Sequence, residues 1–121
     1  MLVNAILGIL KKKGIDIVIE PEHGIVAGVI EDPIEKKYVE GATVAIDPAD
    51  EFTKYFYIPE NILYTQELIS QTDSSGTFIV ANAPSGKAVI TAYAGEPTAP
   101  IGSTRLVVYE NSVAIANILK K

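Results

Sequence analysis

The spacing of apolar residues along the chain changes once, close to residue 14. Before that point, apolar residues recur every three or four positions: Leu2, Val3, Ile6, Leu7 and Leu10. This is the spacing of an α-helix, and Gly14 stands where a helix C-terminus is expected. The sequence therefore predicts a short helix over residues 1–13. Because this helix is apolar on almost every side, we expect it to be buried against another surface.

From residue 15 onward the apolar period falls to two, which is typical of β-strands. The runs with this period cover residues 15–19, 25–30, 42–46, 77–81, 87–93, 104–109 and 113–119. Each run is short, rich in β-branched residues and bounded by Gly, Pro, Asn or Ser. About seven strands without a crossover helix predict an all-β fold, an antiparallel sandwich of two sheets in a single domain over residues 14–121.

Strand pairing and core positions follow from the same pattern. The tight connection at residues 110–112 predicts that the last two strands pair as a hairpin. The apolar side chains expected to be mostly buried are Ile17, Ile19, Val44, Ile46, Phe78, Val80, Ile90, Val108 and Ile115.

Residues 48–71 interrupt the regular rhythm of strands and turns. They hold three of the six tyrosines and two of the three phenylalanines, and strand-like character is expected at residues 53–58 and 62–72. Aromatic rings dominate protein interfaces and also stack on sugars. The candidate binding surface is therefore aromatic: Phe52, Tyr55, Tyr57 and Tyr64. The alternative is structural, with Phe56 and Ile58 in the core and the tyrosines capping the sandwich edge.

Four short motifs between residues 24 and 94 occur in a recognisable order. They are a strand Val26-Ala-Gly-Val-Ile-Glu-Asp32, a Gly-Ala-x-Val strand at Gly41, the element Thr72-Asp-Ser-Ser-Gly-Thr-Phe78, and a Pro-x-Gly turn at Pro84. In this order they resemble the carboxypeptidase regulatory-like domains. The resemblance implies a transthyretin-like (prealbumin-like) sandwich and, for most members, an extracytoplasmic setting. The helix and the insertion at 48–71 depart from that family, so features particular to this chain are expected there.

Charge and composition exclude several classes of function. The chain has 121 residues, 48% of them hydrophobic, and a formal net charge of -5. A packed core is therefore expected, but nucleic acid is not, because phosphate binding requires a clustered basic surface. With no cysteine and a single histidine, we expect no enzyme activity, no cofactor and no metal. His23 lies in a Pro-Glu-His-Gly sequence, which indicates a solvated turn.

Carboxylates offer a calcium site as a minor alternative, since Ca²⁺ takes oxygen ligands. They gather at Asp47, Asp50 and Glu51, and again at Glu31, Asp32 and Glu35. The spacing matches no known calcium loop, so solvated acidic loops are the expectation.

Targeting signals leave the compartment open. Lys11, Lys12 and Lys13 follow the first apolar run instead of preceding it, the opposite of a secretory signal. The run is also about half of the roughly 20 residues that a membrane-spanning helix needs. Contact of residues 1–13 with a membrane surface is a weaker expectation, because lysines follow the apolar helix.

Together these observations indicate a non-catalytic structural or protein-interaction module that binds itself or another protein. A carbohydrate-binding accessory domain is the alternative. The helix, the strand edge at 15–19 and the aromatic segment are the surfaces expected to mediate self-association.

Overall fold

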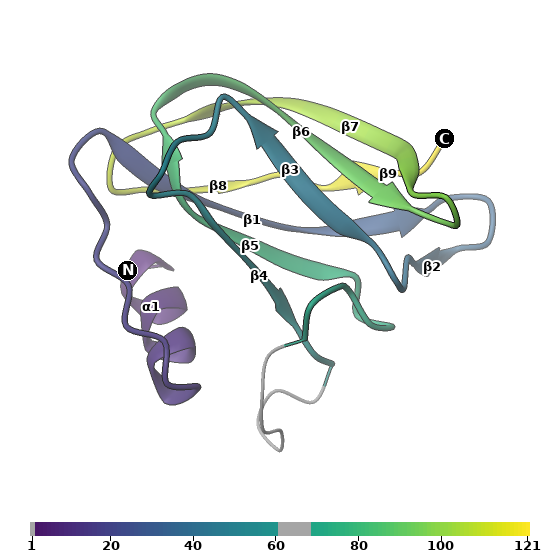
Figure 1. The fold of residues 1–121 in the computed structure, drawn as a ribbon, viewed down its shortest axis with the longest axis horizontal. Coiled ribbons are helices and arrows are strands. Elements are labelled where there is room, and N and C mark those ends of the chain that lie inside the picture. The colour runs from purple at the N-terminus through teal and green to yellow at the C-terminus, as the bar shows by residue number, and fades with distance from the viewer. Residues whose placement is uncertain (1, 61–68) are drawn as a thin grey trace.

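The computed structural model describes residues 2–60 and 69–121 and shows one helix and nine strands within them (Figure 1). In chain order the elements are α1 (Leu2–Lys12), β1 (His23–Asp32), β2 (Lys37–Tyr38), β3 (Thr43–Asp47), β4 (Lys54–Ile58), β5 (Thr77–Pro84), β6 (Gly86–Ala94), β7 (Ala99–Val108), β8 (Val113–Ile115) and β9 (Ile118–Leu119).

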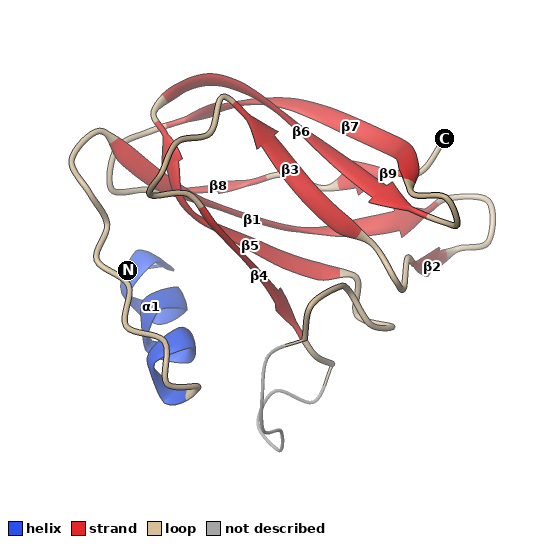
Figure 2. Cartoon of the chain, viewed as in Figure 1, coloured by secondary structure: helices blue, strands red, loops and turns tan. Residues whose placement is uncertain are grey.

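The strands form two packed layers, as Figure 2 shows in red. One sheet has the order β2-β1-β5-β4, with β8 and β9 also paired to β1, and the other has the order β3-β6-β7. All pairs between named strands are antiparallel except those that β8 and β9 make with β1. The predicted all-β antiparallel sandwich is therefore confirmed.

The main core lies between the two sheets and is built from alternate residues of their strands. Phe78, Val80 and Ile90 have no exposed surface, and Val44, Ile46 and Val108 are also buried as predicted. Ile115 was predicted to be buried but is 64% exposed, because its neighbours Ala114 and Ala116 take the inward positions of that segment. Ile17 and Ile19 are only half-buried.

The predicted hairpin between the last two strands is wrong. Residues 113–119 do not pair with β7 but divide into β8 and β9, which both run parallel to β1. The segment also touches β7, since the amide of Lys121 donates to the carbonyl of Ile101 at 2.8 Å. It therefore lies between β1 and β7 and closes that edge of the sandwich. Gly28 and Gly102 permit the approach, because a Cβ at either position would overlap a carbonyl oxygen of the segment.

Residues 15–19 do not form the predicted strand. Their alternation survives as half-buried Ile15, Ile17 and Ile19, but their backbone is not paired with a neighbouring strand. Instead the Asn82 side chain donates to the carbonyl of Val18 at 2.9 Å and accepts the amide of Glu20 at 2.8 Å. One side-chain amide thus replaces the donor and acceptor that a strand edge would provide.

The helix ends as predicted and is buried within the same chain. Gly14 has φ +82°, and the amides of Gly14 and Ile15 donate to the carbonyls of Lys11 and Leu10, the pattern of a Schellman cap. Its apolar side packs on the outer face of β1, β5 and β4, around Ile25, Ile79 and Ile58. Figure 1 shows α1 on the β4 side of the molecule, away from β6 and β7. Within the described residues, no helix has the length and apolar character to cross a membrane.

Candidate interaction surface

Two of the four aromatic residues singled out in the sequence point into the sandwich. Tyr57 is 6% exposed and Tyr55 is half-buried, and both rings belong to the main core. Their hydroxyls accept the amides of Val44 at 2.9 Å and Ile46 at 3.1 Å on β3, in the opposite sheet. The tyrosines therefore satisfy the outward-facing amides of edge strand β3 and join the two sheets.

The other two do not complete an aromatic surface with them. Phe52 is 42% exposed at the loop before β4, whereas Tyr64 lies outside the described residues. Phe56 and Ile58 face away from the tyrosines and pack in the cluster beneath α1. The structural alternative is thus right that β4 is packed, but the tyrosines lie in the main core instead of capping an edge. Of the described set, only Phe52 is exposed as a binding residue would be.

His23 is not the solvated turn residue that the sequence indicated. It begins β1, is 8% exposed, and its ring makes a T-shaped contact with the ring of Phe52, with centroids 5.6 Å apart. Its Nδ1 lies 2.8 Å from the carbonyl oxygen of Pro21, and its Nε2 lies 2.6 Å from a carboxylate oxygen of Asp50. Both the carbonyl and the carboxylate only accept hydrogen bonds, so the ring satisfies both when it is an imidazolium, which donates from both nitrogens.

The pKa values of this pair agree with that assignment. Burial lowers the pKa of His23, but the hydrogen bond to Pro21 and the hydrogen bond and charge of Asp50 outweigh it, so the pKa is raised. The hydrogen bond from His23 holds the pKa of Asp50 below its usual value. The charged groups facing the ring, Asp50 and Glu20, are both acidic. With both nitrogens engaged, the ring is placed to tie loops together and not to act as a general base.

The carboxylates considered for calcium serve local turns. Asp32 accepts the amides of Ile34 and Glu35, both at 3.0 Å, and Asp50 accepts the amide of Phe52 at 3.0 Å. Across residues 2–60 and 69–121, no group of three or more His, Cys, Asp or Glu side chains could hold a metal ion.

The outer face of β3, β6 and β7 is the side of the sandwich opposite α1, and we call it the open face. Strand pairing arranges its side chains in rows across the sheet. The middle row is Ala45, Thr91 and Ser103, and the adjoining row is Asp47, Val89 and Arg105. The exposed side chains in these rows include Ala45, Ser103, Arg105 and Val89, and Val89 is 38% exposed. The outer face of the other sheet is instead covered by the helix.

One end of the open face is apolar with cationic side chains around it. A pocket of about 390 Å³ there is lined by Val89 and Val107 together with Lys87, Arg105 and Asp47. Val107 is 42% exposed. The aliphatic parts of lysine and arginine side chains readily cover such apolar surface while their charged ends stay in water.

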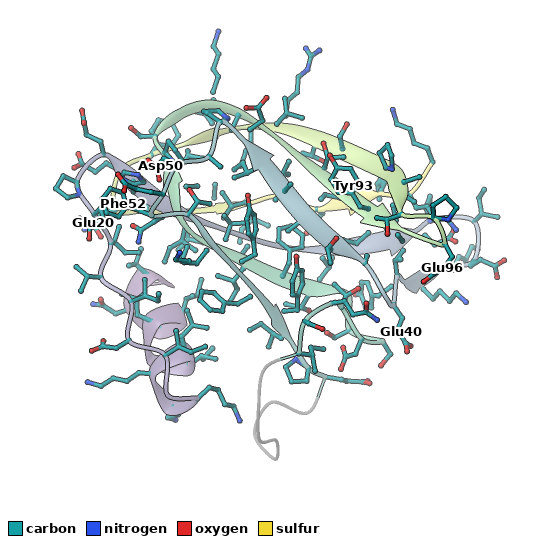
Figure 3. All side chains as sticks on the ribbon, in the orientation of Figure 1. Glu20, Glu40, Asp50, Phe52, Tyr93 and Glu96 are labelled. Atoms are coloured by element: carbon teal, nitrogen blue, oxygen red, sulfur yellow. The ribbon has the colours of Figure 1, made fainter. Side chains whose placement is uncertain are left out.

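The opposite end is acidic. A pocket of about 360 Å³ is lined by Tyr93 at the end of β6, by Glu40 and Glu96, and by Gln71 and Thr43. Figure 3 shows Glu40, Tyr93 and Glu96 at the same end of the molecule, away from Asp50 and Phe52. Both glutamates are exposed and the lining contains no cationic residue.

Sequence reasoning concentrated on the aromatic segment and did not single out the open face. Alternation in residues 87–93 and 104–109 already assigned Val89, Arg105 and Val107 to the side opposite the core residues. It could not show that this side is left exposed while the other sheet is covered, because that depends on where the helix packs.

Comparison with known proteins does not identify the chain. It matches no family model and no curated protein.

Proposed function

We propose that this protein is a non-catalytic β-sandwich module that binds protein, and in the first place itself, through the open face. The main support for the proposal is that the outer face of one sheet is covered by the helix and the outer face of the other is not. The helix buries the outer face around Ile25 and Ile79, whereas Val89 and Val107 remain exposed on the other outer face. Exposed apolar side chains bordered by charge are typical of interaction sites.

The open face is also suited to packing against a second sheet. Its edge strand β3 is held by Tyr55 and Tyr57, so lateral addition of a strand would require breaking their bonds to Val44 and Ile46. Face-to-face contact requires no such change, because the face is formed by side chains on three paired strands. We therefore propose binding through the face and not through strand addition.

The proposal is tested by NMR at increasing protein concentration. Amide signals of β3, β6 and β7 should shift with concentration, and those of β4 and β5 should stay constant. Shifts confined to α1 or to the loop around Phe52 would place the contact elsewhere, and spectra unchanged up to millimolar concentration would contradict self-association.

A carbohydrate-binding accessory role is the second candidate. The pocket at Tyr93 supports it, because it combines an aromatic ring with the amide of Gln71 and the carboxylates of Glu40 and Glu96. Aromatic rings stack on sugars, and amides and carboxylates hydrogen-bond to hydroxyl groups. Binding on a glycan array that is lost on Tyr93→Ala would favour this role, and an array without signal would reject it.

The carboxypeptidase regulatory-like assignment remains part of the proposal. Its support is the order of motifs from residue 24 to residue 94 together with the geometry of the Thr72–Phe78 element. In that element Asp73 accepts the amide of Ser75 at 2.9 Å and Gly76 adopts φ +62°.

A further inference from the structure

The open face carries opposite charges at its two ends. Lys87 and Arg105 stand beside the apolar pocket at the start of β6, and Glu40 and Glu96 line the pocket at its far end. Tyr93 lies six positions after Lys87 along β6, so the two ends of the face are about 20 Å apart. Charge complementarity can therefore decide both the partner and its orientation.

The middle of the face allows close approach. Its central row consists of Ala45, Thr91 and Ser103, whose side chains are small. Two sheets pack at about 10 Å when the facing side chains interdigitate. Small residues between two charged ends permit this separation without a steric clash.

Resting on the proposed function, we infer that the partner on the open face is a second copy of this chain in an antiparallel, two-fold arrangement. The two-fold axis runs across the strands at the row of Ala45, Thr91 and Ser103. Each copy then places Lys87 and Arg105 over the pocket of Glu40 and Glu96 in the other copy. Every contact occurs twice, as two-fold symmetry requires.

The opposite, parallel orientation is disfavoured by the same charges. A two-fold axis along β6 would place the two cationic ends on each other, with Lys87 against Lys87, and would likewise place the two acidic ends, which hold Glu40 and Glu96, on each other. Asp47 on β3 and Arg105 on β7 lie in one row on either side of Val89, so the parallel orientation would pair them across the interface and offset part of this repulsion.

The size of the face sets the expected strength of association. Three strands span about 15 Å, and the two longer ones, β6 and β7, run for about 30 Å, so the face offers at most roughly 450 Å² for each copy, near 900 Å² in total. Stable complexes bury about 1,200–2,000 Å², so a weak dimer that forms with rising concentration is expected.

Paired charge reversals test the arrangement. One variant carries Lys87→Glu and Arg105→Glu, and a second carries Glu40→Lys and Glu96→Lys; all four side chains are exposed. The matched control carries Lys36→Glu and Lys54→Glu, which are exposed outside the open face and give the same net charge as the first variant. Sedimentation velocity over a concentration series measures the dissociation constant, and circular dichroism checks that each variant is folded.

Each variant alone should lose at least tenfold in self-association, and an equimolar mixture of the two should form a heterodimer, since all charge pairs are then opposite. The control should associate more tightly than the first variant. If both variants associate as tightly as wild type, or if their mixture forms no heterodimer, the two-fold arrangement is wrong. Either result leaves binding through the open face intact. If the wild-type protein does not associate at all, the proposed function falls with it.

Discussion

His23 and Asp50 form a charged hydrogen bond of 2.6 Å that joins the start of β1 to the loop before β4. The histidine ring is buried, and its second nitrogen is held by the carbonyl of Pro21. Because both acceptors require a proton from the ring, this connection is complete only while His23 is charged. The sequence segment that leads from α1 into β1 is therefore fixed by a titratable contact.

Stability should consequently fall as the pH rises through the raised pKa of His23. The folded pKa of His23 is raised, so its contribution is fully present below the unfolded value of about 6.5 and is lost as the pH passes the folded pKa. The pKa of Asp50 is lowered, so its contribution is present above about pH 4 and is lost as the pH falls through its folded pKa. Urea unfolding should show greater stability near pH 5.5 than near pH 8.5.

The variant Asp50→Asn isolates this effect. It removes the carboxylate that raises the pKa of His23, so the difference in unfolding free energy between the two pH values should shrink. Glu51→Gln, at the exposed neighbouring position, is the control and should retain the wild-type difference. Equal pH dependence in wild type and Asp50→Asn would show that the pair does not control stability.

Removing the Tyr57 hydroxyl should weaken the connection between the sheets. In Tyr57→Phe the ring can still fill the core, but the buried amide of Val44 loses its acceptor. Leaving a buried donor unsatisfied costs about 1–3 kcal/mol. Tyr109→Phe, at a side chain that is 67% exposed, should change stability little. Chemical denaturation compares the two, and equal midpoints would contradict the bonding of Tyr57 to β3.

Detaching the helix should expose a second apolar surface. Val3 is 7% exposed and contacts the cluster around Ile25 and Ile79, so Val3→Asp would place a charge in that cluster. We expect stronger binding of a hydrophobic dye and faster amide exchange in β1 and β5. Asn4→Asp, on the exposed side of the helix, is the control. If both variants bind dye equally, the helix does not protect this face.

The sequence pattern predicted most inward-facing positions but not the partners of the strands. Alternation is a local property, and it correctly placed Phe78 and Ile90 in the core. It also predicted a strand at residues 113–119. It could not show that this segment leaves the sheet of β7 and pairs in parallel with β1 in the other sheet. Pairing depends on long-range contacts that periodicity does not encode.

Local sequence patterns also misjudged the candidate site, because its contacts are long-range. Tyr55 and Tyr57 were considered for binding because tyrosines are common at interfaces, but their hydroxyls found backbone partners in the opposite sheet. His23 looked solvated because its neighbours in sequence are turn residues, whereas Asp50, 27 residues away, bonds to its ring and Phe52 packs against it. Both outcomes depend on residues that are distant in sequence.

The most direct measurement for self-association through the open face is sedimentation velocity of wild type and Val89→Asp across a wide concentration range. Val89 lies in the face and is 38% exposed, so a charge there should disrupt packing without unfolding the domain. Val18→Asp, at a position that is 70% exposed outside the face, is the control. We expect wild type and the control to dimerise and Val89→Asp to remain monomeric; a wild type that stays monomeric, or a Val89→Asp variant that dimerises like it, would contradict the claim.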